Sequence, residues 1–255
     1  MQQKTRRLAA SALAAVGVVG LSLGASGVAS AASWDHYQAT LNPLNGQDAS
    51  GSISVGLSGN QVKVTEDTSG LAAKFQGGPF PHAQHFHIKG QGQCPTPSAD
   101  SNGDGVVSTP EAQGDYGKIG ATLTTKGDTS PKSALAVKRV PGGSSYHYQR
   151  TFTVSDAVAS QIKAGNAVVV VHGLDPATMG KKAQKEKSPL DKSLPLAATA
   201  PALCGPLSAM PAGGAGTGGG STAGVENGAE FGLGGAALAA AVAVAGVGYR
   251  RRRTQ

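Results

Sequence analysis

The chain has 255 residues, with 22 basic and 15 acidic side chains and a formal net charge of +7 at pH 7. Seven of the basic residues are terminal, namely Lys4, Arg6, Arg7 and the arginines at 250–253, so the 15 that remain balance the 15 acidic ones. The charge surplus is therefore confined to the termini. This distribution excludes the basic surface of a nucleic-acid-binding protein, and we expect no nucleic-acid partner.

The first residues are typical of a secretory signal. Lys4, Arg6 and Arg7 precede a long apolar run, and Ala29-Ser30-Ala31 forms a small-x-small cleavage site. We therefore expect residues 1–31 to be a helical signal peptide, and the mature protein to begin near Ala32 outside the cytoplasm.

Residues 32–208 are predicted to form one β-domain, because apolar and polar residues alternate there as in half-buried strands. The expected strands are a hairpin over 50–67 that turns at 58–60, followed by 85–89, 118–127, 133–140, 146–155, 166–174 and 202–207. One short helix is expected over 156–164, because Ser155 can cap its start and Gly165 can end it. Short strands and Gly-rich turns predict an all-β fold, a Greek-key sandwich or barrel.

Cys94 and Cys204 are the only cysteines. In an exported chain such a pair predicts a disulfide. The disulfide would tie the region after the first histidines to the last strand. Closing so long a loop stabilises the folded state by about 4 to 5 kcal/mol in the chain-entropy model. The alternative is a pair of thiolate metal ligands, which suits an exported protein less well.

Residues 100–111, DSNGDGVVSTPE, match a calcium-binding loop of the EF-hand type. The loop positions 1, 3, 5, 7, 9 and 12 are filled by Asp100, Asn102, Asp104, the carbonyl of Val106, Ser108 and Glu111. Gly105 stands at position 6, where the chain must turn sharply. Pro95 and Pro97 prevent a helix before the loop, so we expect a lone calcium loop within the β-domain. The alternative is a solvated acidic turn.

The C-terminal region is predicted to anchor the protein. Residues 209–230 are a Gly-rich linker, and 231–249 contain no charge and are long enough to cross a membrane. The basic tail at 250–255 should remain in the cytoplasm. We therefore expect a single-pass cell-membrane protein with a C-terminal transmembrane helix and an extracellular main domain. The alternative for 231–249 is a weak buried helix.

Three segments resemble copper/zinc superoxide dismutase, in the same order along the chain: HFH at 85–87, VVVVHGLD at 168–175 and ALCGPL at 202–207. The segments LNPLNG and SGLAA, with the histidine-rich strand, also resemble the CHRD (chordin-type) domain. The chain is most similar to exported actinobacterial proteins of the CHRD or dismutase-like type. The resemblance covers residues 36–207 and implies a dismutase-like sandwich.

The resemblance implies that His85, His87 and His172 are copper ligands. Residues two apart on a strand face the same side, so His85 and His87 can share a metal while Phe86 points into the core. Neutral imidazoles suit copper or zinc. His82 is a candidate fourth ligand, although Pro81 favours a loop there. The alternative is that the histidines are ordinary polar residues on a strand.

The chain departs from the dismutase pattern in two ways. There is no histidine between His87 and His147 to form a second metal site, and Pro201 stands where the dismutase has an arginine that guides superoxide. We therefore expect a non-catalytic surface domain, stabilised by calcium and a disulfide, that binds an extracellular protein or cell-wall component. A copper-dependent dismutase or copper-binding protein is the alternative.

Overall fold

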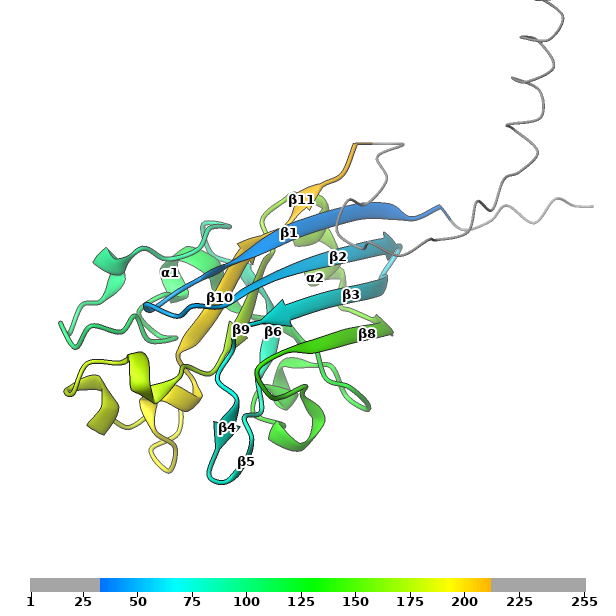
Figure 1. The fold of residues 1–255 in the computed structure, drawn as a ribbon. Coiled ribbons are helices and arrows are strands. Elements are labelled where there is room, and N and C mark those ends of the chain that lie inside the picture. Colours follow the sequence, from blue (N-terminus) through cyan, green and yellow to red (C-terminus); the bar gives the residue numbers. More distant parts are fainter. Residues whose placement is uncertain (1–32, 212–255) are drawn as a thin grey trace, which may run out of the picture. The chain divides into compact units, whose positions relative to one another are not determined.

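The computed structural model describes residues 33–211 (Figure 1). The predicted signal peptide (1–31), most of the linker (209–230), the predicted membrane span (231–249) and the basic tail (250–255) lie outside the described residues and stay predictions. Within 33–211, no helix is long and apolar enough to cross a membrane.

The described chain consists of short strands with two short α-helices, which confirms the all-β prediction. The strands are β1 (Asp35–Pro43), β2 (Ser50–Ser58), β3 (Gln61–Ser69), β4 (Lys74–Phe75), β5 (Gly78–Pro79), β6 (Gln84–Lys89), β7 (Gly117–Thr122), β8 (Tyr146–Thr153), β9 (Val168–His172), β10 (Pro201–Pro206) and β11 (Ser208–Ala209). The α-helices are α1 (Gln113–Tyr116) and α2 (Asp156–Lys163). Single 3-10 turns are η1 (Pro97–Ala99), η2 (Pro131–Ser133), η3 (Val137–Arg139), η4 (Pro176–Thr178), η5 (Ala183–Lys185) and η6 (Leu196–Ala198).

One antiparallel sheet runs in the order β7-β6-β9-β10-β1-β2-β3-β8, and β11 pairs with β1. Strand β1 joins the two halves, because residues 35–41 pair with β2 while Asn42 and Pro43 pair with β10. The halves form two layers, with β1, β2, β3 and β8 in front of β6, β9 and β10 (Figure 1). The sequence does not predict β1, the strand that makes this connection.

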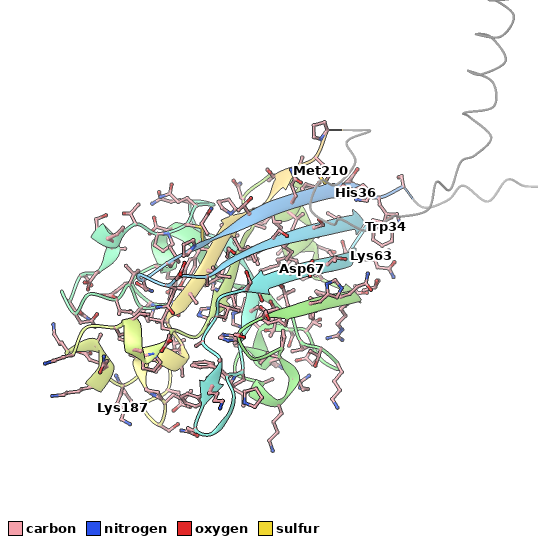
Figure 2. The ribbon with its side chains drawn as sticks, in the orientation of Figure 1. Trp34, His36, Lys63, Asp67, Lys187 and Met210 are labelled. Carbon is pink, nitrogen blue, oxygen red and sulfur yellow. A yellow bond between two sulfur atoms is a disulfide. The ribbon has the colours of Figure 1, made fainter. Side chains whose placement is uncertain are left out.

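The main core lies between the two layers. Alternate residues of β2 and β3, such as Val55 and Val64, are buried against alternate residues of β6 and β9, such as Phe86 and Val169. The intervening residues of β3, including Lys63 and Asp67, point to solvent (Figure 2). This period of two follows from the pleat of a strand with one wet face.

The predicted hairpin and helix are both confirmed. Strands β2 and β3 pair from Ser50–Ser69 to Ser58–Gln61 around a two-residue turn, in which Gly59 has φ +58°. Helix α2 begins after Ser155, whose hydroxyl accepts a hydrogen bond from the backbone N–H of Val158. It is followed by Gly165 at φ +71°. Each feature depends on residues close in sequence, which is why a local pattern finds it.

The strand predicted over 133–140 is wrong, because this segment forms the turns η2 and η3. Polar side chains hold it locally: Asp128 accepts from the Ser133 hydroxyl, and Arg139 donates to the carbonyl of Lys126 and to the Ser133 hydroxyl. Such local bonds compete with strand pairing. The apolar residues Leu135 and Val137, which produced the alternating pattern, are exposed.

Candidate metal centre

The three predicted histidine ligands come from two neighbouring strands. Strand β6 pairs with β9 so that His85 lies opposite Val170 and His87 opposite Val168. His172 is two residues beyond Val170, and therefore shares its face of the sheet. Phe86 and Val169 point to the main core on the other face. The pairing of β6 with β9 thus places all three imidazoles on one side of the sheet.

The imidazoles converge, as the ligand prediction requires. His85, His87 and His172 each offer a ring nitrogen, and these nitrogens all lie within 4.8 Å of one another. The side chains are 2%, 1% and 3% exposed, so the alternative of outward, solvated strand histidines does not apply. Among residues 33–211 this is the one group of three or more histidine, cysteine or acidic side chains with that geometry.

Each imidazole uses one nitrogen for a hydrogen bond and leaves the other free. The bonded nitrogens face backbone carbonyls: His85 Nε2 faces Ala134 at 3.2 Å, His87 Nδ1 faces Gly117 at 3.0 Å, and His172 Nδ1 faces Thr199 at 2.8 Å. A carbonyl can only accept, so these nitrogens carry the protons. The opposite nitrogens, His85 Nδ1, His87 Nε2 and His172 Nε2, are buried without a partner. Their lone pairs are available to a metal.

Burial also keeps the three imidazoles neutral. Desolvation lowers the pKa of His85 well below its usual value, with repulsion from His172 and His87 adding to the shift. For the same reason the pKa of His87 falls to about 3 and that of His172 to about 4. Neutral imidazole is the form that binds a metal ion, so no proton has to be displaced at neutral pH.

His82 is not part of this group, so its prediction as a fourth ligand is wrong. Its Nδ1 lies 2.9 Å from the carbonyl of His172, and its Nε2 lies 3.0 Å from the carbonyl of Ala72. Both nitrogens are therefore engaged with backbone. His82 is fully buried and contacts the main chain of His172.

Two cavities reach the histidines from outside. A cavity of about 230 Å³ borders His85 and His172, and one of about 300 Å³ borders His87. Thr109, Ile119 and Leu190 line both. The three unpartnered nitrogens are thus enclosed, and the two cavities lie directly beside their imidazoles.

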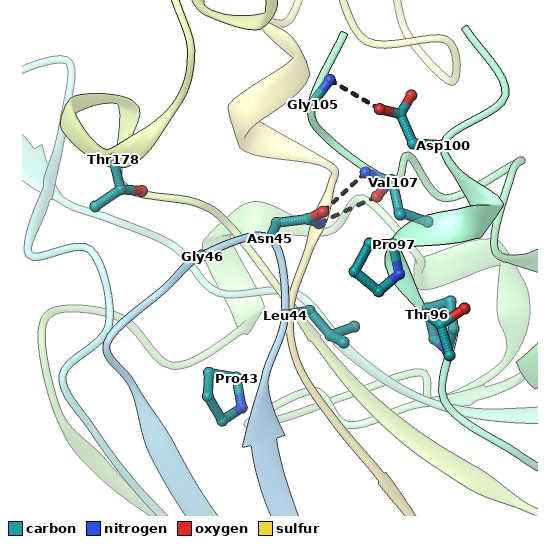
Figure 3. Close-up of a pocket in the computed structure, with 11 residues that line it drawn as sticks. Pro43, Leu44, Asn45, Gly46, Thr96, Pro97, Asp100, Gly105, Val107 and Thr178 are labelled. Atoms are coloured by element: carbon teal, nitrogen blue, oxygen red, sulfur yellow. Dashed lines mark hydrogen bonds between the residues drawn. The ribbon is translucent and has the colours of Figure 1, made fainter. Parts of the chain in front are cut away.

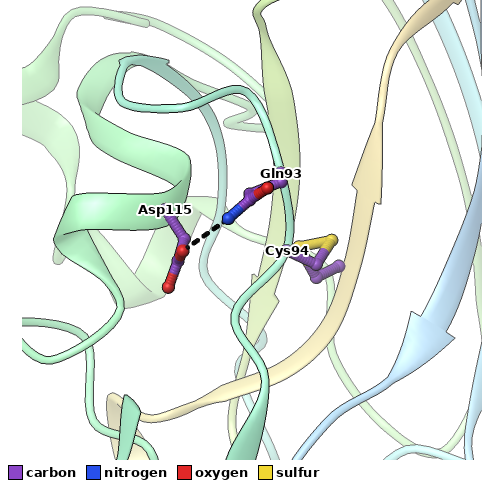
Figure 4. The surroundings of a disulfide bond; sticks show 4 residues. Gln93, Cys94 and Asp115 are labelled. Atoms are coloured by element: carbon purple, nitrogen blue, oxygen red, sulfur yellow. Dashed lines mark hydrogen bonds between the residues drawn. A yellow bond between two sulfur atoms is a disulfide. The ribbon is translucent and has the colours of Figure 1, made fainter. Parts of the chain in front are cut away.

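The segment between β6 and β7 covers the centre, and the predicted disulfide fastens it. Cys94 and Cys204 are bonded, with an S–S distance of 2.02 Å (Figure 4). Cys204 on β10 packs with Val168 and Val170 on the histidine-bearing face. Next to the bond, Gln93 Nε2 donates to Asp115 Oδ1 at 2.9 Å. The disulfide prediction is confirmed, and thiolate metal ligation is excluded for this pair.

Sequence reasoning missed the residues that fix the imidazoles. Tyr116 is fully buried, with its ring 4.4 Å from that of His87, and its hydroxyl donates to the carbonyl of Thr109. The Thr109 hydroxyl donates in turn to the carbonyl of Thr199, the group that holds His172. No sequence pattern marks these contacts, because most of the acceptors are backbone carbonyls.

The predicted calcium loop folds around its own carboxylates. Asp100 accepts hydrogen bonds from the backbone N–H groups of Gly103 and Gly105, and Glu111 accepts from the N–H and hydroxyl of both Ser101 and Ser108. The three acidic residues of the loop do not form a convergent group like that of the histidines. Calcium binding at Asp100, Asn102, Asp104, Val106, Ser108 and Glu111 therefore stays a prediction.

A further cavity lies away from the histidines. It has a volume of about 560 Å³ and is lined by residues of 43–46, 95–97 and the calcium loop (Figure 3). Asn45 fixes its wall, because its side chain donates to the carbonyls of Val107 and Pro201 and accepts from the N–H of Val107. Asp100 is its one ionisable lining residue and is already bonded to backbone.

No protein-family model matches this chain, and no curated protein matches it. Among solved structures, it is similar to Candida albicans superoxide dismutase 5 in a Cu(II) form, with 15% identity and a TM-score of 0.39 over 74% of this chain and 100% of that chain. A likeness of this size does not assign a function. The CHRD resemblance stays a prediction, and the functional conclusions rest on the geometry described above.

Proposed function

We propose that the domain is a copper-binding module whose ligands are His85, His87 and His172. The observation that carries the proposal is the set of three buried imidazole nitrogens without hydrogen-bond partners, all within 4.8 Å of one another. An unpaired buried polar atom costs about 1 to 3 kcal/mol. Three such atoms facing a common point are costly unless something binds them together, and a metal ion does so.

The donor set favours copper. Imidazole suits copper and zinc, and divalent copper binds a given nitrogen site more tightly than zinc. No carboxylate or thiolate belongs to the ligand group, so all three ligands are neutral nitrogen donors. Three imidazoles leave at least one coordination position of a four-coordinate ion without a protein ligand. Bound there, copper would supply one-electron chemistry and bind an external ligand.

The protein residues prepare the site in advance. The carbonyls of Ala134, Gly117 and Thr199 select the tautomer of each imidazole and fix its ring direction. The packed ring of Tyr116 limits rotation of His87. Because the ligands are neutral and oriented before metal arrives, little reorganisation opposes binding.

We place this module at the cell surface as a non-catalytic binding or structural domain. The sequence supports that setting through the signal pattern at 1–31 and the anchor pattern at 231–249. Its partner would be an extracellular protein or cell-wall component. A dismutase-like Greek-key arrangement and a calcium ion in the loop at 100–111 belong to the same proposal, supported by the order of the motifs and by the loop pattern.

The test is metal analysis of the exported domain after incubation with equal amounts of copper and zinc. We expect about one copper per chain in the wild type and little in His172→Ala. His147→Ala is the matched control, because His147 is exposed and paired with Asp67. Zinc in place of copper would refute the choice of metal. Equal copper in His172→Ala and the wild type would refute the site.

A further inference from the structure

The cavity of about 230 Å³ beside His85 and His172 has an almost wholly apolar wall. Its apolar lining residues are Ala83, Ile119, Ala134, Leu135, Leu190 and Ala198. The two threonines in the wall have no free hydroxyl: Thr109 donates to the carbonyl of Thr199, and the Thr199 hydroxyl bonds that of Ser188 at 2.7 Å. The imidazoles of His85 and His172 are the polar side chains that remain in the wall, and their unpartnered nitrogens are buried behind it.

Exposed hydrophobic side chains gather at this cavity. Within residues 33–211 three large hydrophobic side chains are exposed, Leu135 at 42%, Val137 at 47% and Leu190 at 47%. Two of the three, Leu135 and Leu190, line the cavity. A single exposed leucine is ordinary, but two beside one cavity provide apolar contact for a ligand that enters it.

The wall of this cavity also carries no charged side chain. None of its lining residues is a lysine, arginine, aspartate or glutamate. An inorganic anion entering here would lose water and find no cationic side chain to replace it. Lys118 lines the separate cavity at His87 and is exposed to solvent. The wall of the apolar cavity therefore adds no side-chain charge that would favour an anion over a neutral ligand.

From these observations we infer that the cavity binds a small uncharged ligand with an apolar body and one nitrogen or oxygen donor, which completes the coordination of the metal. This inference rests on the proposed copper site. The volume fits one aromatic ring, because a dry cavity of about 150 Å³ already holds benzene. Burial of the ring supplies the binding free energy, while the donor atom fixes the orientation of the ligand in the cavity.

The test compares ligands that share a donor but differ in body. Copper-loaded protein is titrated with 4-phenylimidazole, imidazole and azide, and binding is followed by the copper electron paramagnetic resonance and visible spectra. We expect 4-phenylimidazole to bind at least about tenfold more tightly than imidazole, because its phenyl ring is buried. Azide should bind more weakly than 4-phenylimidazole. Equal affinities for the two imidazoles, or tighter binding of azide, would overturn the inference.

Two variant pairs locate the effect. Ala198→Phe fills the cavity and should remove the preference for 4-phenylimidazole while leaving copper content unchanged. Ala177→Phe, an exposed position on η4 that does not line the cavity, should keep it. Leu190→Ser and Val137→Ser form a milder pair, because both side chains are equally exposed but only Leu190 lines the cavity. Leu190→Ser should weaken the preference, and Val137→Ser should keep it. A preference that survives both Ala198→Phe and Leu190→Ser would place the ligand elsewhere.

A metal-free measurement separates this inference from the proposed function. The melting temperature of the metal-free wild type should rise more with 4-phenylimidazole than with imidazole. Ala198→Phe should abolish this difference. If copper fails to bind but this difference is seen, the proposed function falls and the apolar cavity ligand stands. If copper binds and no difference is seen in either experiment, the inference falls and the copper site stands.

Discussion

Glu66 lies on β3 with its carboxyl group inside the core. It is fully buried, and its neighbours are Tyr146, whose hydroxyl donates to it at 3.4 Å, and Gln84, whose amide nitrogen can donate to it when oriented towards it. Burial raises the pKa of Glu66 to about 8, while the hydrogen bond from Tyr146 opposes the shift. The carboxyl group is therefore protonated at neutral pH.

Glu66 should make the domain less stable as the pH rises. Its pKa is higher in the folded state than in the unfolded chain, so its contribution is fully present below the unfolded value of about 4.3 and is lost as the pH rises through the folded value. Between pH 7 and 8 we expect the contribution of Glu66 to the free energy of unfolding to fall by about 1 kcal/mol, because the group is half ionised at its folded pKa.

The comparison is urea unfolding of metal-free wild type and Glu66→Gln between pH 7 and 9. Any slope from the histidines is common to both proteins, so it cancels when the two slopes are compared. Glu66→Gln should remove the fall, because its side chain does not titrate. An equal slope in both proteins would show that another group is responsible.

At the scale of elements, the segment from Gly90 to Tyr116 is the part of the chain that closes the metal centre. It carries the disulfide, the predicted calcium loop, Thr109 and Tyr116. It contains little regular structure, so its position depends on a few fixed points. These are the bond to Cys204, the hydrogen bonds of Asn45 and the packing of Tyr116.

Removing the disulfide should destabilise the domain and loosen the metal centre. The bonded cysteines are 110 residues apart, and the chain-entropy model gives a loss of about 4 to 5 kcal/mol for a loop of this size. The double variant Cys94→Ala/Cys204→Ala should lose this amount in urea unfolding and release copper faster to a chelator. An unchanged release rate would mean that the disulfide does not hold the segment over the histidines.

Calcium should stabilise the same segment. The loop offers the carboxylates of Asp100, Asp104 and Glu111, and a ligand that binds only the folded state raises its stability. We expect a calcium chelator to lower the melting temperature of the wild type and to have no effect on Glu111→Gln. Asp48→Asn, an exposed acidic residue outside the loop, should behave as the wild type. No calcium-dependent shift in the wild type would remove the hypothesis.

At the scale of the whole molecule, two layers bury an apolar core, and the metal centre lies on the outer face of one layer. Pro201 lies opposite His172 in the β9–β10 pairing, at the position where the sequence resemblance leads one to expect a guiding arginine. Lys118 is the one cationic side chain that lines the two cavities at the histidines. The surroundings therefore do little to attract superoxide.

Dismutation by the copper-loaded domain should consequently be negligible. No cationic side chain lines the apolar cavity, and the histidine pattern for a second metal is missing from the sequence. A superoxide assay on copper-loaded protein checks this, with metal-free protein as the baseline. Rapid turnover that disappears in His172→Ala would instead establish a copper-dependent enzyme.

The sequence by itself determined the features that depend on near neighbours. The hairpin at 50–67, the cap at Ser155 and the shared face of His85 and His87 each follow from a period or turn within a few residues. The disulfide followed from the presence of two cysteines in a chain with a predicted signal peptide, which left one pairing. The strand predicted at 133–140 failed because its alternating pattern has no neighbouring strand to pair with.

Only the tertiary structure decided which nitrogens face the metal position. Pairing of β6 with β9 brings His172 to His85 and His87, and carbonyls from three separate segments then choose the free nitrogen of each ring. Register and loop position are set by burial between residues distant in sequence, which a local period does not encode. The sequence therefore named the three histidines, while the packing of the folded chain set the direction of their rings, their neutral charge and the apolar cavity beside them.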